Sequence, residues 1–415
     1  MVGKKYFWML VVVCAYWLQG CSLKGKNSPI DNDNAQKRTE LTFDLKGQLT
    51  KCEDQLSSSL LKNQDINYHP RLIEAGEVSW EKRQNNVLSW TVGFYPGILW
   101  YMYDATENSD WKTAAATRTA ALEPYKFNKQ HHDTGFMMYC SYGNGHRLTG
   151  SKAYKEVLLQ SAASLASRYN PNVGTIKSWS NIMHPRWSQH ITIIDNMLNL
   201  ELLYWVAKNG GGREYYNIAT RHAETTMENH FRPDMTSWHV IEYDSITGKV
   251  LNRHTKQGYA DDSRWARGQA WGIYGYSMVY RETGDKKFLD FAMKLTDKYL
   301  SMLPEDYVPY WDFDAPNIPN EERDASAAAV VASGLIELSA LIEDKVLSTK
   351  YLNAAIRMLN SLSSDSYSGY GKSDAFLLHS TGAKPLGHEI DVALIYADYY
   401  YLEALLRLQE LLQTS

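Results

Sequence analysis

Residues 191–207 read ITIIDNMLNLELLYWVA, and residues 265–280 read WARGQAWGIYGYSMVY. Both stretches are apolar or aromatic on nearly every side of a helix, so we expect other elements to enclose them on all faces. By contrast, KKFLDFAMKLTDKYL at 286–300 has one charged face, which is typical of a helix with one side in water. The two kinds of segment together indicate an inner layer of helices surrounded by an outer layer.

The helical period continues along the chain from about residue 42. Strand-like alternation is confined to WHVIEY at 238–243, which with the following DSITG and VLNRHT predicts one β-hairpin between helices. Helix pairs can close into a ring or coil as an open solenoid. The enclosed segments favour an all-α fold, a six-hairpin (α/α) toroid or barrel with a short inserted β-hairpin. The expected helical segments are 42–63, 90–105, 111–125, 133–147, 151–168, 191–208, 213–230, 264–283, 286–302, 323–343, 348–362 and 389–413.

Composition narrows the class of function. The 415 residues include 43 Lys+Arg and 47 Asp+Glu, a formal net charge of −4, and 44% are hydrophobic, as in a folded globular protein. The near-neutral charge balance and the pI near 6.3 argue against a nucleic-acid binder, which needs a basic face, but they leave local clusters of charge open. The 13 Trp and 29 Tyr suit flat amphipathic ligands such as sugars, although many of these rings must be core.

The first 21 residues, MVGKKYFWMLVVVCAYWLQGC, have the pattern of a signal peptide. The apolar run is short for a membrane span, and LQGC at its end resembles a bacterial lipobox, so we expect Cys21 to carry lipid; a short transmembrane anchor is the alternative. Lys24 and Lys26 differ from the acidic export signal of many Bacteroides surface lipoproteins, which favours a periplasmic location on the membrane. The expected organisation is a signal peptide at 1–20, a polar tether at 21–41 and one toroid at 42–415.

Two further cysteines, Cys52 and Cys140, lie in the expected folded part. They can pair in an oxidising compartment, but their spacing does not resemble a disulfide framework, and we expect two buried free thiols. No CxxC or HExxH spacing occurs, which argues against a structural zinc site or a zinc protease site.

Two aspartates are candidate acid–base residues. Asp133, in HHDTGFMMYCSYGNG, precedes an aromatic-rich helix that it can cap, although His131 and His132 beside it indicate an end that faces a ligand. Asp195 lies within the first apolar segment, where ionisation is costly, so its pKa should be raised. A carboxyl that keeps its proton near neutral pH suits a general acid. The alternative for Asp195 is a buried carboxyl that only hydrogen-bonds a neighbouring helix.

Aromatic and basic side chains gather in several loops. The segment 238–271 contains His, Gln, Trp and Arg; Trp faces bind sugar rings, and the Arg fork of donors binds carboxylate or sulfate. SWTVGFYPG at 89–97 bends at Gly and Pro and leaves Trp90 to line a cavity, and IKSWSNIMHPRW at 176–187 is a further aromatic signal. HSTGAKPLGH at 379–388 lies in the loop before the last helix, and its His and Lys side chains can bind an acidic or sulfated ligand. The alternative is that the Trp side chains are core and the cations are solvated.

The strings WTVGFYPG, HHDTGF, IIDNMLNLELLYW, HTKQGYADDSRWARGQAWGIYGY and ALIYADYYYLEALLRL together resemble glycoside hydrolase family 88, the unsaturated glucuronyl hydrolases. The resemblance covers roughly residues 85–410. It implies a six-hairpin toroid that needs no metal or organic cofactor. It also implies removal of the 4,5-unsaturated uronic acid that a polysaccharide lyase leaves at the non-reducing end of a glycosaminoglycan fragment. The expected chemistry is hydration: a proton goes to C4, water adds at C5, and the hemiketal opens to release the saccharide.

The resemblance also implies roles for single residues. Asp195 matches the acid/base residue of the family, and Asp133 matches a second essential aspartate, which we assign to holding the sugar hydroxyls and the charge distribution. Because water adds to a double bond, the rule that relates carboxylate separation to retention or inversion does not apply. Arg267 is the expected partner of the substrate carboxylate. The expected substrate-binding residues are Trp90, His132, Trp179, His239, Arg253, Thr255, Gln257, Trp265, Arg267, Trp271, His379 and Lys384.

Three positions differ from relatives that accept sulfated substrates. His379 and Gly382 stand where hydroxyl side chains occur in some relatives, and Arg253 replaces smaller residues, which leaves the sulfate preference open. The parent glycan (chondroitin, hyaluronan, heparin or another), the linkage and the oligomeric state are also left open by the sequence.

Other functions fit part of the pattern. A sister toroid hydrolase acting on unsaturated galacturonyl or rhamnogalacturonyl groups of pectin fragments is the nearest, although HHDTGF and RWARGQAW favour the glucuronyl branch. A toroidal polysaccharide lyase needs a Tyr/His or Tyr/Arg base, for which no motif is comparably specific. A non-catalytic sugar-binding lipoprotein needs aromatic platforms but has no use for a protonated, buried aspartate.

Overall fold

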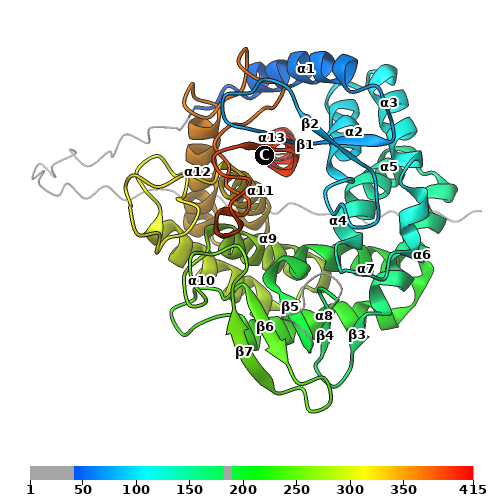
Figure 1. Cartoon of the computed structure of the whole chain (residues 1–415), viewed down its shortest axis with the longest axis vertical. Coiled ribbons are helices and arrows are strands. Elements are labelled where there is room, and N and C mark those ends of the chain that lie inside the picture. The colour runs from blue at the N-terminus through cyan, green and yellow to red at the C-terminus, as the bar shows by residue number, and fades with distance from the viewer. Residues whose placement is uncertain (1–41, 181–188, 415) are drawn as a thin grey trace, which may run out of the picture. The chain divides into compact units, whose positions relative to one another are not determined.

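A computed structural model describes residues 42–180 and 189–414, and these residues form a ring of helices in two layers (Figure 1). The inner layer consists of α2 (Phe94–Thr106), α4 (Thr134–Met138) with η2 (Tyr139–Gly143) and α5 (Asn144–Thr149), η3 (Ile194–Asn199) with α7 (Leu200–Val206) and η4 (Ala207–Gly211), α9 (Ala266–Thr283), α11 (Ala325–Leu341) and α13 (Ile395–Thr414). The outer layer consists of α1 (Leu45–Lys62), α3 (Ser109–Ala120), α6 (Lys152–Ala166), α8 (Arg213–Asn229), α10 (Lys286–Met302) and α12 (Lys345–Leu362). Besides η3, the described residues contain two further 3₁₀ helices, η1 (Glu123–Phe127) and η5 (Lys384–Leu386).

The ring is closed, as the enclosed segments predicted. Each inner helix contacts the next, and α13 contacts both α11 and α2, so the first and last inner helices are neighbours. The inner helix α9 buries every residue from Ala266 to Val279, whereas α10 buries only residues of one face, at helical spacing. Burial on all sides requires a second layer, and the one-sided helices provide it.

A three-stranded antiparallel sheet lies at one edge of the ring, at the bottom of Figure 1. It contains β6 (Val240–Tyr243) and β7 (Val250–His254), which confirm the predicted hairpin, and also β5 (His190–Ile193). The apolar segment at 191–207 therefore begins as a strand and becomes helical only at Ile194. The β-branched run Ile-Thr-Ile at 191–193 favours an extended backbone.

The expectation that strands are confined to this hairpin is wrong. Strand β1 (Tyr68–Ile73) pairs with β2 (Glu81–Gln84) and with β8 (Ala393–Leu394), and β3 (Tyr169–Asn170) pairs with β4 (Thr175–Ile176). Strand β8 directly precedes α13, so the last helix begins at Ile395 and not at residue 389. The pairing of β1 with β8 joins the two ends of the folded chain beside the closing helix.

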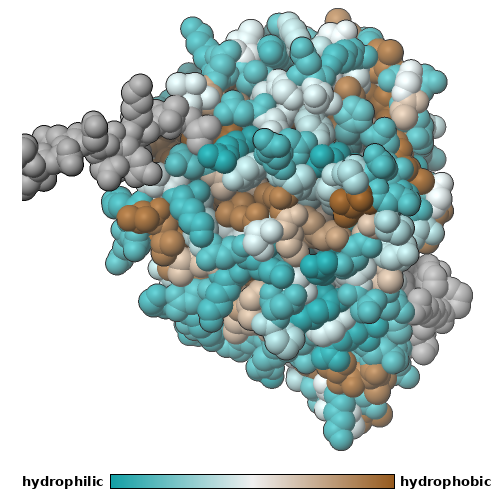
Figure 2. Space-filling view, turned by 90° about the vertical axis from the view of Figure 1, so that its left-hand side faces the viewer, coloured by the Kyte–Doolittle hydropathy of each residue, from teal (hydrophilic) through white to brown (hydrophobic). Residues whose placement is uncertain are grey.

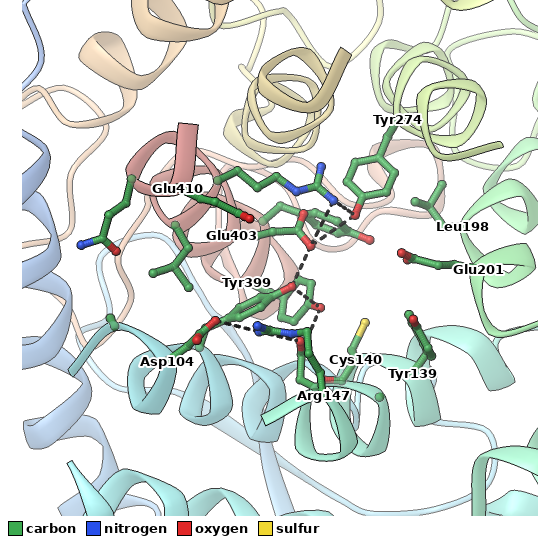
Figure 3. A pocket seen from close by; sticks show the side chains of 18 of the residues that line it. Asp104, Tyr139, Cys140, Arg147, Leu198, Glu201, Tyr274, Tyr399, Glu403 and Glu410 are labelled. Atoms are coloured by element: carbon green, nitrogen blue, oxygen red, sulfur yellow. Dashed lines mark hydrogen bonds and ion pairs between the residues drawn. The ribbon is translucent and has the colours of Figure 1, made fainter. Parts of the chain in front are cut away.

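The two ends of the ring differ in chemistry. A cavity of about 940 Å³ lies inside the ring and is lined by residues of α2, α4, α5, α7, α9 and α13 (Figure 3). Its polar groups satisfy one another: Glu403 accepts hydrogen bonds from Tyr101, Tyr274 and Ser333. The N-terminal ends of the inner helices carry the candidate acid–base residues instead. Helix N-termini are partially positive, and they favour an anionic ligand at that end.

Cys52 and Cys140 are free and buried, as expected. Within residues 42–180 and 189–414, no helix has the length and apolar character needed to cross a bilayer. The predicted signal peptide, the tether and Cys21 lie outside the described residues. Figure 2 shows one face of the molecule, which is mostly hydrophilic, with apolar side chains in small separate groups.

Candidate active site

Asp195 lies in the first turn of η3, directly after β5, and not in the middle of a long helix as the sequence suggested. Its side chain is 14% exposed, and its Oδ2 has no hydrogen-bond partner among the described residues. Burial raises the pKa of Asp195 to about 7; Arg267 opposes this shift, and the negative charge of Asp133 adds to it. The carboxyl therefore keeps its proton up to neutral pH, as its apolar surroundings predicted.

Asp133 occupies the N-cap position of α4, but its side chain makes no capping hydrogen bond, so capping is not its role. Its Oδ2 lies 3.0 Å from Nδ1 of His131, and its Oδ1 lies 3.3 Å from Nε2 of His132. Burial disfavours the negative charge, but these imidazoles and Arg168 outweigh burial and hold the pKa of Asp133 below its usual value. The site thus holds one ionised carboxylate and one protonated carboxyl, an arrangement suited to acid–base chemistry.

His239 faces Asp195 with a defined nitrogen. Its Nδ1 accepts a hydrogen bond from the backbone N–H of Lys256 at 3.2 Å, so Nε2 carries the hydrogen in the neutral ring. Burial, Lys256 and Arg267 hold the pKa of His239 well below its usual value. The ring lies 4.4 Å from that of Trp265 and meets Trp179 edge-on at 6.2 Å.

Aromatic rings from three inner helices and the loop before α2 surround the two carboxyl groups. Trp90 packs against Phe136 at 5.4 Å and against Tyr396 at 5.1 Å, and Trp271 packs against Phe136 at 5.5 Å. Trp271 is fully buried, whereas Trp90 is partly exposed. Trp90 is therefore accessible to a ligand, and Trp271 is not exposed to solvent; their predicted contacts with a sugar ring stay predictions.

Several buried polar atoms at this end of the ring lack hydrogen-bond partners within residues 42–180 and 189–414. A buried donor or acceptor without a partner costs free energy, and such atoms are rare in native proteins. Donors and acceptors of this kind can pair with the hydroxyl and carboxylate oxygens of a polar ligand. These atoms include Oδ2 of Asp195, Oδ1 of Asn196, Nε2 of His239, Nε1 of Trp265 and Nε1 of Trp271.

No protein-family model matches the chain. The chain is 45% identical over 328 residues to the unsaturated glucuronyl hydrolase of Formosa agariphila, a match that covers 78% of this chain and 80% of the relative. The chain belongs to the unsaturated glucuronyl hydrolases. It is therefore a glycosidase.

Solved structures of this family share the fold. The crystal structure of an unsaturated glucuronyl hydrolase specific for heparin matches with a TM-score of 0.84 at 43% identity, covering 89% of this chain and 98% of the other. A structure of a family variant with dGlcA-Glc-Rha-Glc matches with a TM-score of 0.83 at 30% identity, covering 88% of this chain and 96% of the other. The toroid read from the sequence is thus the fold of the unsaturated glucuronyl hydrolases.

In this unsaturated glucuronyl hydrolase, Arg267 is buried and its charge is already compensated. Its Nη1 donates to Oδ2 of Asp324 at 2.5 Å and to the carbonyl of Thr381 at 2.7 Å, and its Nη2 donates to the carbonyl of Gly382 at 2.7 Å. Gln257 also donates to the carbonyl of Gly382, at 2.9 Å. Arg267 therefore holds the loop before α13 in place, and its role toward the substrate carboxylate stays a prediction.

Thr255 and Trp179 lie beside His239. The hydroxyl of Thr255 is 3.3 Å from Nδ1 of His239, and it accepts a hydrogen bond from the backbone N–H of Gly258 at 2.8 Å. The ammonium of Lys256 lies over the ring of Trp179, 4.6 Å from its centroid. The structure thus brings the 255–257 turn together with the predicted aromatic residues.

Three predicted binding residues have partners of their own. Nδ1 of His379 lies 2.7 Å from Oδ1 of Asp391. The ammonium of Lys384 pairs with both Glu321 and Glu322. Arg253, on the exposed strand β7, lies over the ring of Trp238. Carboxylates from the segment before α11 and from the loop before α13 pair with His379 and Lys384, and the role of these cations toward a ligand stays a prediction. Only the tertiary fold brings these carboxylates within reach.

Sequence reasoning missed Arg71 and Glu389, which form a buried ion pair between β1 and the loop before α13. The guanidinium of Arg71 lies 5.4 Å from the centroid of the Trp90 ring, and its Nε and Nη1 have no partner in the described chain. Only a weak sequence pattern pointed to Arg71: it is one charged residue beside the apolar residues at the end of YHPRLI, residues 68–73.

A metal site is not evident in the described parts of the chain. No group of three or more His, Cys, Asp or Glu side chains within residues 42–180 and 189–414 is arranged to hold a metal ion.

Proposed function

We propose that this enzyme removes the 4,5-unsaturated uronic acid from the non-reducing end of glycosaminoglycan oligosaccharides that a polysaccharide lyase has produced. The observation that carries the proposal is the pair of carboxyl groups: Asp195 keeps its proton up to about pH 7, while Asp133 is ionised. The dGlcA-containing ligand of a structural relative supports an unsaturated uronyl group as the substrate.

In the proposed mechanism, Asp195 donates its proton to C4 of the vinyl ether, and positive charge develops at C5 and the ring oxygen. Water adds its oxygen at C5 and returns a proton to the Asp195 carboxylate. The hemiketal formed at C5 opens and releases the remaining saccharide. Asp133, held ionised by His131 and His132, holds the sugar hydroxyls and favours the positive charge that develops in the transition state.

We also propose that the preferred substrates come from heparin. The support is the 43% identity to a solved structure specific for heparin, over 89% of this chain. The ammonium of Lys384 is paired with Glu321 and Glu322, so this proposal assigns it no contact with sulfate.

The test follows the ultraviolet absorbance of the conjugated double bond in unsaturated disaccharides from heparin, chondroitin and hyaluronan. We expect loss of absorbance with the wild-type protein, fastest for a heparin disaccharide, and no loss with the nearly isosteric Asp195→Asn variant, which still binds. Asp104→Asn, at the opposite end of the ring, is the matched control and should keep activity.

Other outcomes overturn the proposal. Turnover by Asp195→Asn means that another residue donates the proton. Turnover of pectin-derived galacturonyl substrates alone supports the sister activity. Binding of every disaccharide without turnover supports the sugar-binding lipoprotein.

We further propose that Cys21 carries a lipid that holds the enzyme on the periplasmic side of a membrane. The lipobox-like LQGC at 18–21 and the polar segment that follows support this location. Cells that express the full chain should incorporate labelled palmitate into the protein and retain it in the membrane fraction. Cys21→Ala should abolish both, and retention of label in that variant contradicts the proposal.

A further inference from the structure

Helix η3 carries two buried asparagines besides Asp195. Asn196 and Asn199 are both fully buried. Because a 3₁₀ helix has three residues per turn, residues three apart lie on the same face, so the two carboxamides form one row. Asn196 is anchored by its Nδ2, which donates to the carbonyl of Ile176 at 2.9 Å. This face of η3 therefore presents fixed amide groups toward its neighbours.

The orientation of the Asn199 amide follows from its partners. The backbone N–H of Phe136, in the first turn of α4, donates to Oδ1 of Asn199 at 3.0 Å. The oxygen must face that donor, so the Nδ2 group points the other way, toward Nδ1 of His132 at 3.4 Å. One side chain thus links η3, which carries Asp195, to the helix end that carries Asp133.

The contact between η3 and α4 is unusually close. A Cβ at Gly135 would lie 2.5 Å from Cα of Asn199 and 2.6 Å from its Oδ1, so only glycine permits this approach. The close approach is what brings the Asn199 amide within reach of both Phe136 and His132.

We propose that Asn199 is a positioning residue that holds His132 in the tautomer whose Nε2–H faces Asp133. The Nδ2–H of Asn199 occupies the lone pair on Nδ1 of His132, so the ring hydrogen is on Nε2, 3.3 Å from Oδ1 of Asp133. In the other tautomer a lone pair on Nε2 would face the carboxylate and repel it. Burial lowers the pKa of His132 to about 4, so the ring is neutral at pH 7 and its tautomer matters.

The inference rests on the roles proposed above for Asp133 and Asp195. An ionised Asp133 raises the pKa of Asp195, so a group that keeps Asp133 ionised also keeps the proton on Asp195. Asp133 ionises below its usual pH, so loss of Asn199 should first raise the pKa of Asp133 and move the acidic limb of activity to higher pH. The charged or titratable groups that act on this pair are His131, His132, Arg168 and Lys256 around Asp133, and His239 and Arg267 around Asp195.

The experiment compares Asn199→Leu, which keeps the size but removes both hydrogen bonds, with Asn144→Leu. Asn144 is also buried, but it bonds Cys140 and Tyr399 at the other end of the ring. We expect Asn199→Leu to lower kcat about tenfold at pH 7 and to move the acidic limb of the kcat profile, which reports Asp133, up by about half a unit or more. Asn144→Leu should leave that limb in place.

A second readout does not depend on turnover. In protein labelled with ¹⁵N in its histidines, the resonances of His132 should show the Nε2–H tautomer in the wild type and a shifted tautomer balance in Asn199→Leu. Should Asn199→Leu fail to fold, Asn199→Ala removes the same donor without adding apolar bulk, and the same measurements apply.

An unchanged limb and an unchanged tautomer in a folded Asn199 variant overturn the inference and leave Asn199 as a packing residue. That result does not affect the proposed function, because an inactive Asp195→Asn supports the function independently. Turnover by Asp195→Asn overturns the function and this inference together.

Discussion

His239 presents an Nε2–H to Oδ2 of Asp195 across 3.8 Å. This separation is too long for a hydrogen bond, so the donor does not stabilise the carboxylate, and Asp195 keeps its proton while the substrate is absent. His239 is held neutral by burial and by the neighbouring Lys256 and Arg267. A sugar oxygen that enters this gap can accept the Nε2–H while Asp195 donates its own proton.

The activity should fall as the pH rises through about 7. The proton donor is Asp195 with a pKa of about 7, and each pH unit above that value leaves about tenfold less of the protonated form. Because the pKa of Asp133 is below its usual value, the acidic limb should lie below the ordinary carboxyl range. Initial rates from pH 3 to 9, with buffer overlap to exclude buffer effects, check both limbs. A profile that is flat between pH 6 and 9 is inconsistent with Asp195 as the acid.

Asp195→Asn should be more stable than the wild type above pH 7. The folded pKa of Asp195 is raised from 3.8 to about 7, so its contribution to the free energy of unfolding becomes less favourable between these pH values. Replacing it with the neutral amide should add up to about 4 kcal/mol at pH 8 and little near pH 4. Urea unfolding at several pH values measures the difference, with Asp104→Asn as the control. A stability difference between Asp195→Asn and the wild type that is equal at all pH values contradicts this explanation.

Asp324→Asn should both destabilise the fold and lower the pKa of Asp195. Asp324 is the ionic partner of the buried Arg267, and an unpaired buried charge costs about 3–5 kcal/mol. The uncompensated charge of Arg267 should then favour ionised Asp195, so the high-pH limb of activity moves to lower pH. Chemical unfolding and a pH–rate profile of the folded fraction measure the two effects. A shift of the limb to higher pH contradicts the assigned charge relationship.

Gly382→Ala should disrupt the ion pair of Arg71 and Glu389. A Cβ at position 382 would lie 2.1 Å from Oε2 of Glu389, so the carboxylate has to move away from Arg71. We expect a loss of about 2–4 kcal/mol in unfolding free energy, because the buried guanidinium loses its partner. Glu389→Gln, which keeps the shape and removes the charge, should show a similar loss. Stability equal to the wild type in both variants rules out this account.

Lys384→Ala should have little effect on substrate binding. The ammonium of Lys384 is neutralised by Glu321 and Glu322, so we expect KM for sulfated and unsulfated disaccharides to change less than about threefold. Glu322→Gln, which removes one of the two carboxylate charges, is the comparison and should lower KM for sulfated substrates. A large rise in KM limited to sulfated substrates in Lys384→Ala would instead place this lysine at the substrate.

Local sequence patterns were sufficient for the helices and the ring, but not for the strands. The contrast between the 265–280 segment, which is apolar or aromatic on nearly every side, and the 286–300 segment with one charged face identified the two layers, because the spacing of apolar and charged residues along a helix can be read from local sequence. The strands β1, β5 and β8 escaped prediction because they are short, and a short apolar run is compatible with a strand or a helix until a partner strand is known.

The residue types in the chain already specified a proton donor, since a lone carboxyl in the apolar surroundings of Asp195 must resist ionisation. They did not specify which way Asp133 faces, whether Lys384 is paired, or that Arg71 meets Glu389, 318 residues away in the chain. Those features depend on contacts between distant segments. The free energy of a charge is set by its partners and its burial, and both exist only once the ring has closed.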